Sequence, residues 1–164
     1  YLFKGTVEEN LKMAKPDAMK EEMEAVLQKV NLLGFLQTQD GLQTQLLEKA
    51  SNLSGGQCQR LVIARALLRT DSAVYIFDEA ASNIDVESEE LIMNVIHELA
   101  KTKTVLLISH RLANVVKSDK IYFLKDGEIK ESGKHDELMC RNGAYRHLYE
   151  SQMALENYGK GGVA

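Results

Sequence analysis

The fold is decided by an apolar run that ends in two acidic residues, Ala73-Val74-Tyr75-Ile76-Phe77-Asp78-Glu79. Its apolar part, with β-branched side chains, predicts a buried strand over residues 73–77. A second apolar run predicts a strand at Thr104–Ile108, and the segment between them, Val86–Lys101, has apolar residues at helical spacing. Strands that alternate with helices form parallel sheets covered on both faces. The sequence therefore predicts an α/β fold.

The N-terminal side of this unit has a helical pattern. Apolar residues recur at helical spacing between Met19 and Val30, and another helix is predicted from Ser54 to about Arg69. We therefore assign residues 1–70 to a helical subdomain.

The C-terminal side continues the α/β part. A third apolar run, Ile121–Leu124, precedes the turn residues Lys125-Asp126-Gly127 and predicts a hairpin with Glu128–Glu131. Two helical segments are expected next, Asp136–Met139 and Ala144–Leu155. We assign residues 71–157 to the α/β core and residues 158–164 to a flexible tail.

The composition limits the class of protein. The chain has 164 residues, of which 45% are hydrophobic and 27% are charged, and this balance is typical of a folded domain. A net charge of -4 argues against a broad nucleic-acid-binding face. The apolar runs are far too short to span a bilayer, so we expect a soluble chain. Cys58 and Cys140 form no CxxC pair and fit a reducing compartment.

A glycine-rich helix start lies at Leu53-Ser54-Gly55-Gly56-Gln57. Ser54 and Gln57 have the spacing of a capping box, in which each side chain accepts from the other residue's backbone N–H. Two glycines in the first turn leave backbone N–H groups uncovered, and with the helix dipole these can bind a phosphate. An ordinary helix cap without a ligand fits the same residues, so the motif alone leaves both interpretations open.

Reactive side chains also follow both predicted strands. Asp78 and Glu79 stand where ligands bind in open α/β sheets. An Asp there can hold Mg²⁺, and a neighbouring Glu can polarise water. His110 follows the second strand and can contact a phosphate near neutral pH. An exposed acidic strand end and a structural histidine are the alternatives when each site is taken alone.

Taken together and in this order, the three sites resemble the ATP-binding cassette (ABC) family. Leu53–Gln57 matches its signature sequence, Ile76–Glu79 its Walker B segment and His110 its switch histidine. Ser82-Asn83-Ile84-Asp85 matches its D-loop, although Leu is commoner than Ile at position 84. The resemblance implies part of a P-loop NTPase (RecA-like) parallel sheet with an N-terminal helical subdomain.

The subtype is indicated by strings in the second half of the chain. Those that look like the exporter branch are Ser109–Leu112, Asp126–Ile129, Gly133–Leu138 and Gly143–Tyr145. In that branch the ATPase follows a transmembrane domain on one polypeptide. The resemblance thus implies a fused or associated transmembrane domain, a position on the cytoplasmic face of the cell membrane, and no nucleic-acid partner.

The resemblance also implies a site for ATP and Mg²⁺ shared between two paired cassettes, identical or different. The residues it assigns to ATP binding are Ser54, Gly55, Gly56, Gln57, Ser82 and Asp85. Asp78 would hold Mg²⁺, Glu79 would polarise the hydrolytic water and His110 would brace the γ-phosphate.

One family motif is missing from these 164 residues, the phosphate-cradling G-x-x-x-x-G-K-[ST]. The nearest stretch, from Gly127 to Gly133-Lys134, has the wrong spacing and continues with His135. We therefore expect the C-terminal portion of a cassette, with Tyr1 not a native start, and an isolated chain that is inactive. Without a P-loop strand, the strand at 73–77 should also have an unpaired edge.

Two other functions fit part of the pattern. A soluble ABC ATPase acting on nucleic acid or ribosomes shares the signature, but the acidic composition and the exporter-like strings disfavour it. A non-catalytic regulatory module would lack a P-loop, but an intact Glu79 and His110 disfavour that reading.

Overall fold

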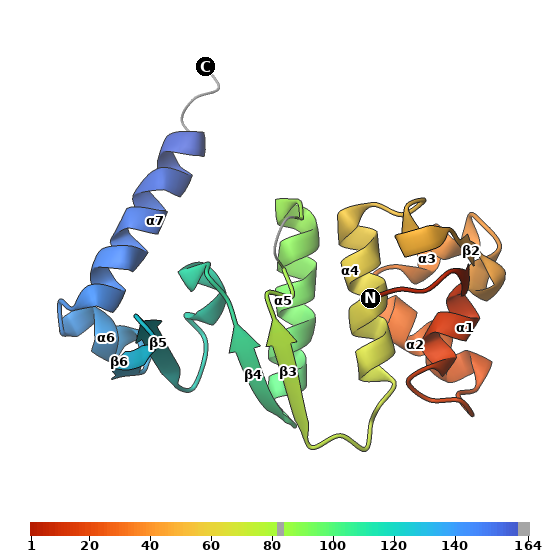
Figure 1. The fold of residues 1–164 in the computed structure, drawn as a ribbon, viewed down its shortest axis with the longest axis horizontal. Coiled ribbons are helices and arrows are strands. Elements are labelled where there is room, and N and C mark those ends of the chain that lie inside the picture. Colours follow the sequence, from red (N-terminus) through yellow and green to blue (C-terminus); the bar gives the residue numbers. More distant parts are fainter. Residues whose placement is uncertain (82–83, 161–164) are drawn as a thin grey trace. The chain divides into compact units, whose positions relative to one another are not determined.

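The computed structural model describes residues 1–81 and 84–160, with side chains up to residue 155. The chain divides into two compact units, Tyr1–Ile108 and Ser109–Ala164. In the first unit, short helices precede a strand–helix–strand segment, and the second unit is a hairpin with two helices (Figure 1). The predicted α/β class is therefore confirmed.

The first unit contains the following elements. In chain order they are β1 (Gly5–Thr6), α1 (Val7–Lys12), α2 (Lys20–Lys29), α3 (Leu33–Gln37), η1 (Gly41–Gln43), β2 (Gln45–Leu46), η2 (Glu48–Ala50), α4 (Gly55–Leu67), β3 (Val74–Asp78), α5 (Val86–Ala100) and β4 (Thr104–Ile108). The helix predicted around Met19 begins at Lys20, and Met19 is its exposed cap residue rather than part of the apolar face.

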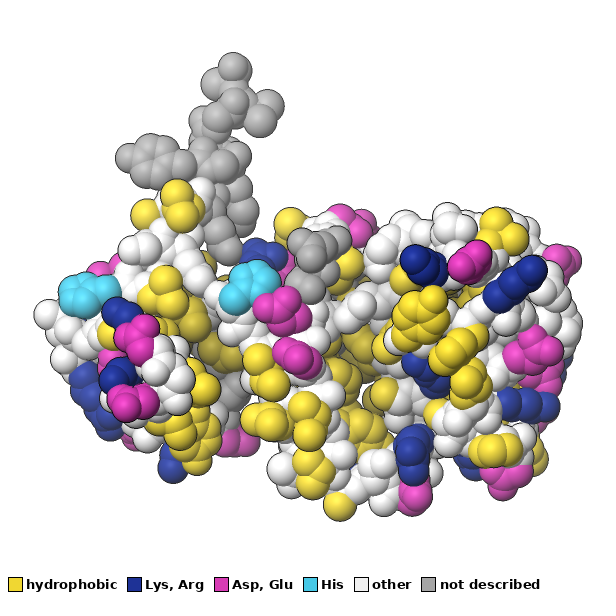
Figure 2. Space-filling model, in the orientation of Figure 1, with side chains coloured by type: hydrophobic (Ala, Val, Ile, Leu, Met, Phe, Trp, Pro, Cys, Tyr) yellow, Lys and Arg dark blue, Asp and Glu magenta, His cyan; other side chains and the backbone are white. Residues whose placement is uncertain are grey.

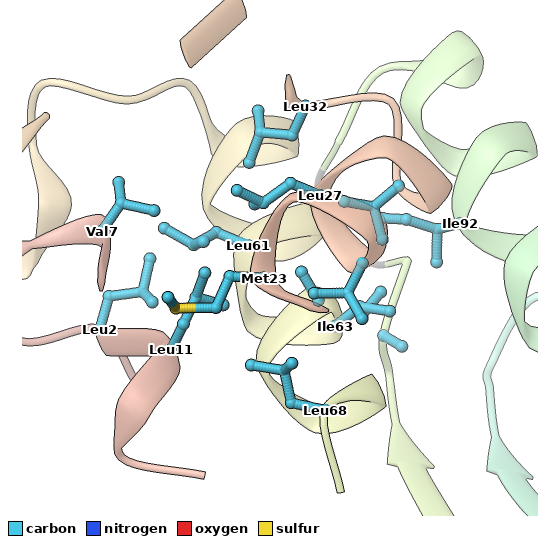
Figure 3. Packing of buried hydrophobic residues seen from close by; sticks show 14 of the residues in the cluster. Leu2, Val7, Leu11, Met23, Leu27, Leu32, Leu61, Ile63, Leu68 and Ile92 are labelled. Atoms are coloured by element: carbon cyan, nitrogen blue, oxygen red, sulfur yellow. The ribbon is translucent and has the colours of Figure 1, made fainter. Parts of the chain in front are cut away.

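The core of the first unit is built around α4. Leu61 of α4 packs with Met23 and Leu27 of α2, and Ile63 of α4 lies toward Ile92 of α5 (Figure 3). All five side chains are buried. Burying one such aliphatic side chain contributes roughly 2 kcal/mol, so this packing fixes the direction of α4 against both neighbouring helices.

The start of the chain is held by one buried side chain, that of Asn10. Its Oδ1 accepts from the Phe3 N–H at 2.9 Å, and its Nδ2 donates to the carbonyl oxygens of Phe3 and Thr6 at 2.9 and 3.0 Å. Since a buried amide is costly unless it is hydrogen-bonded, this set of bonds specifies the path of residues 3–6.

β3 and β4 form a two-stranded parallel sheet, from Val74 opposite Thr104 to Asp78 opposite Ile108. Tyr75 and Phe77 point into the core. The opposite face bears Val74, Ile76, Leu106 and Ile108, which are all exposed. On the side seen in Figure 2, apolar side chains gather over these strands.

Two sequence-based expectations concern this sheet: the unpaired edge of its first strand and the covering of both its faces. Among the described residues no further strand pairs with β3 or β4, so the unpaired edge is present. The expectation that the sheet is covered on both faces is wrong for residues 1–81 and 84–160. In this part of the chain, the segment that links the strands buries one face only.

The second unit contains η3 (Leu112–Val115), β5 (Ile121–Lys125), β6 (Glu128–Gly133), α6 (His135–Cys140) and α7 (Ala144–Lys160). β5 and β6 form the predicted antiparallel hairpin. Its turn residues Asp126 and Gly127 both have positive φ, as a two-residue hairpin turn requires. The third apolar run thus belongs to a separate antiparallel sheet and does not extend the parallel one.

Helix α7 docks on the hairpin through Tyr145, which is fully buried. The Tyr145 ring meets Phe123 edge to face, and its hydroxyl lies 2.8 Å from His135 Nδ1. The helix runs to Lys160 instead of ending near Leu155, so the first three residues of the predicted tail are helical. Residues 161–164 of that tail lie outside the described residues. In the part of the chain that is described, no helix has the length and apolarity needed to cross a bilayer.

Substitutions on the two faces of β3 should differ in how much stability they cost. Phe77 is 7% exposed, and Phe77→Ala should lower the free energy of unfolding by about 3 kcal/mol because it leaves a cavity in the core. Ile76 is 65% exposed, and Ile76→Thr, which keeps the β-branch, should cost less than about 1 kcal/mol. Urea unfolding of the two variants of this chain measures both values. Equal losses would contradict the burial pattern of the sheet.

Candidate functional site

The glycine-rich segment is the N-terminus of α4, and its predicted capping box is confirmed. The Ser54 Oγ accepts from the Gln57 N–H at 3.2 Å, and the Gln57 Oε1 accepts from the Ser54 N–H at 2.9 Å. Both side chains therefore hold the helix start in shape. The backbone of the first turn, rather than these side chains, is left to meet a ligand.

The electrostatics of this helix start favour an anion. α4, like α3 and α7, has no acidic residue in its first turn, whereas α1, α2, α5 and α6 each carry two there. Helix N-termini carry partial positive charge, and their first N–H groups have no partner within the helix. Gly55 is exposed among the described residues, so this turn is open at that position. The residues present fit a phosphate group.

The start of α5 lies against the start of α4. Asp85 caps α5, with its Oδ1 accepting from the Ser88 N–H at 2.8 Å. The Ser88 amide, the Ser88 hydroxyl and, more weakly, the Arg60 charge hold the pKa of the Asp85 carboxyl below its ordinary value of 3.8. Asp85 thus has a capping role within its own chain besides the contact that the resemblance assigns to it. Ser82 lies outside the described residues.

Asp78 and Glu79 lie side by side at the end of β3, and both are exposed. Glu79 has φ of 49°, in the left-handed region that residues with a side chain rarely occupy. Its N–H donates to the Ile108 carbonyl at 2.9 Å, which continues the ladder between β3 and β4 by one bond. Residues held in this region can belong to functional sites, although Asn31, Lys49, Ala50, Asp126 and Asn142 share a positive φ elsewhere in the described chain.

His110 belongs to the second unit, where it follows β4 and is exposed. Gln152 of α7 bonds the backbone of its loop. The Gln152 Nε2 donates to the His110 carbonyl at 2.8 Å, and its Oε1 accepts from the Leu112 N–H at 2.9 Å. Gln152 therefore fixes the backbone on both sides of Arg111.

Three residues of this region had no role in the sequence analysis: Arg60, Ser88 and Gln152. Arg60 donates from Nη1 to the Asn31 carbonyl at 3.0 Å and from Nε to the Gly56 carbonyl at 3.3 Å. Gln59-Arg60 directly follows the signature sequence and is part of the ABC resemblance, which is the signal that singles out Arg60. Ser88 packs on Gly56, and Gln152 bonds the backbone of His110 and Leu112. Both contacts join residues far apart in the sequence, so no local motif predicts them.

A magnesium ion would find one ligand here in Asp78. Within the described ranges, no group of three or more His, Cys, Asp or Glu side chains is arranged to hold a metal. Mg²⁺ usually takes one or two carboxylates and completes its shell with water and substrate phosphates. An exposed strand-end carboxylate fits that chemistry.

Comparisons with known proteins identify the family of this chain. A family model described as ABC transporter matches residues 2–82. An uncharacterized ABC transporter ATP-binding protein of Haemophilus influenzae is 52% identical over 95% of this chain and 28% of its own length. An ATP-dependent lipid A-core flippase of Mannheimia succiniciproducens is 44% identical over 93% of this chain and 26% of its own length. The chain belongs to the ABC transporter family.

The structure of a bacterial Atm1-family ABC exporter with ATP bound is also similar to this chain. The TM-score is 0.84 at 31% identity, over 92% of this chain and 26% of the exporter. The ABC resemblance and the fold predicted from it are thereby confirmed. The chain spans about a quarter of the length of these ABC relatives. The individual site residues remain predictions.

The cap of α5 predicts a pH-dependent contribution to stability. Because folding lowers the pKa of Asp85, its carboxylate stabilises the native state above the unfolded value of about 3.8 and ceases to do so as the pH falls through the lower native value. Asp85→Ala should therefore lower the free energy of unfolding at pH 7, and the difference from wild type should shrink below pH 4. Urea unfolding between pH 7 and pH 2.5 measures it.

The control for this experiment is Glu90→Ala, because Glu90 is an exposed carboxylate of the same helix. Its effect should be small at every pH. A loss in Asp85→Ala that is the same at pH 7 and pH 2.5 would show that the ionised cap is not the cause.

Proposed function

We propose that this chain forms part of the ATP-binding and ATP-hydrolysing domain of an exporter-type ABC transporter, which couples ATP hydrolysis to transport across a membrane. The observation that supports it most is the start of α4, a capped helix with two glycines and no carboxylate in its first turn. The names of relatives, an ATP-dependent flippase and an ATP-bound exporter, support the transport role. We place the domain on the cytoplasmic face of the membrane, attached to a transmembrane domain.

We propose for each site residue the role that the resemblance implies, and the position of each residue supports it. Residues 54–57 would bind the γ-phosphate of ATP held by a second cassette, through the N–H groups of the α4 start. Asp78 would hold Mg²⁺, which supplies positive charge next to the phosphates. Glu79, aimed by its left-handed backbone, would accept a hydrogen bond from the attacking water and polarise it. His110, on a loop held by Gln152, would donate to the γ-phosphate.

The apolar outer face of the β3–β4 sheet is consistent with a larger cassette. Parallel sheets are normally buried on both sides, and a two-stranded sheet has little stability of its own. Relatives about four times as long as this chain have additional segments that could cover Ile76 and Leu106. We propose that these side chains pack against the rest of the ATPase core.

Replacement of Glu79 tests the catalytic assignment. In the full-length protein that carries this sequence, Glu79→Gln removes the charge and keeps the size of the side chain. Magnesium-dependent ATP hydrolysis should fall by roughly 100-fold or more, while binding of ATP is retained. Glu90→Gln, at an exposed position of α5, is the matched control and should hydrolyse ATP at the wild-type rate. A Glu79→Gln rate within a few-fold of wild type would assign the base elsewhere.

The isolated 164-residue chain provides a second test. Since its sequence has no G-x-x-x-x-G-K-[ST] cradle for the β- and γ-phosphates, we expect neither tight ATP binding nor turnover. Calorimetric titration with ATP and Mg²⁺, with phosphate release measured in parallel, checks both. Magnesium-dependent turnover by the purified chain, abolished by Glu79→Gln, would contradict this prediction.

A further inference from the structure

The two adjacent glycines of the α4 start stand in different surroundings. Gly55 is exposed, whereas Gly56 is buried where α4 meets α5. A Cβ added at Gly56 would stand 2.9 Å from the Ser88 Cβ and 3.2 Å from Asp85 Oδ2, and still closer to the Ser88 Oγ. Real Cβ atoms essentially never come as close as this one would to Ser88, and the contact with Asp85 would be tighter than most. The side of Gly56 that lacks a Cβ therefore faces α5 and not a ligand.

Ser88 is built into the other side of this contact. It is 6% exposed and lies at the third position of α5, where its N–H donates to the Asp85 Oδ1 at 2.8 Å. The cap holds the Ser88 backbone and with it the Cβ, so this atom cannot move away from Gly56 without disturbing the cap. The Ser88 hydroxyl is held by its own bond to the Asp85 carboxylate. Arg60 in turn donates to the Gly56 carbonyl and to the Asn31 carbonyl. The first turn of α4 is thus held by the packing on Ser88 and by the hydrogen bond from Arg60.

From these contacts we propose that Ser88 is a positioning residue that sets where the start of α4 lies relative to the start of α5, and that Gly56 is a glycine because of this packing. The Gly56 N–H remains among the phosphate-binding groups of the α4 start, while the missing side chain makes room for Ser88. The consequence for catalysis rests on the proposed function, in which the α4 start binds phosphate and Asp85 lies in the neighbouring D-loop. A residue larger than glycine at position 56 would push the two helix starts apart.

Paired substitutions in the full-length protein test this directly. Gly56→Ala should lower the kcat for ATP hydrolysis by about tenfold or more, because displacement of a phosphate-binding backbone by a fraction of an ångström is costly. Ser88→Gly removes the two Ser88 atoms that the new Cβ would meet and keeps the N–H that Asp85 accepts. The double variant should therefore recover kcat to within about threefold of Ser88→Gly alone, and Gly56→Ala with Ser88→Ala should recover part of it.

Gly55→Ala is the matched control. It adds the same methyl group one residue earlier, on the exposed side, and its loss of activity should not be relieved by Ser88→Gly. Rescue of Gly56→Ala and not of Gly55→Ala supports the proposal. A Gly56→Ala enzyme with wild-type kcat, or a double variant that folds and stays as inactive as Gly56→Ala, overturns it.

Melting temperatures keep the test independent of activity. If Gly56→Ala does not fold, the double variant should fold and hydrolyse ATP, and a double variant that remains unfolded also overturns the proposal. If the wild-type protein does not hydrolyse ATP, the proposed function fails. The packing of Gly56 on Ser88 is then judged separately, from whether Ser88→Gly restores the melting temperature lost in Gly56→Ala.

Discussion

The packing of α4 between α2 and α5 is the interaction on which the first unit depends. Leu61 and Ile63 supply the buried contacts along the helix, and Gly56 allows the closest approach at its first turn. Because interiors are packed at crystal-like density, a helix held in this way has little freedom to slide or tilt. The candidate phosphate-binding backbone at residues 54–57 therefore has its position set by apolar contacts on the far side of the same helix.

Polar contacts then fix the orientation of helix starts and loops, which apolar packing does not specify. The capping box of Ser54 and Gln57 shapes the start of α4, the Asp85 cap shapes the start of α5, and Arg60 spans α4 and the end of α2. In the second unit Gln152 does the same for the loop of His110. Hydrogen bonds add modestly to stability, but their directionality restricts orientation. The end of β3, which carries Asp78 and Glu79, is held instead by the backbone bond from the Glu79 N–H to the Ile108 carbonyl.

Much of the fold could be read from local patterns. The strand at Thr104–Ile108 and the start of the helix at Val86 have the predicted bounds, and the hairpin after Ile121 forms around the predicted turn. The outer face of β3 could not be read in this way. A continuous apolar run indicates burial on both sides, yet Ile76 is exposed, since nothing in the described chain covers it. Likewise, no local signal shows that Met19 caps α2 and lies outside the core.

The sequence by itself determined the chemistry that can occur. Residue types and spacing identified the glycine-rich helix start, the strand-end Asp78 and Glu79, and the family to which the chain belongs. These features are local, because caps, strands and turns depend on residues a few positions apart. The tertiary structure decided which neighbours hold that chemistry in place: Ser88 against Gly56, and Gln152 beside His110. Those partners are 32 and 42 residues apart in the chain and meet only because helices pack and hydrogen bonds close across the fold.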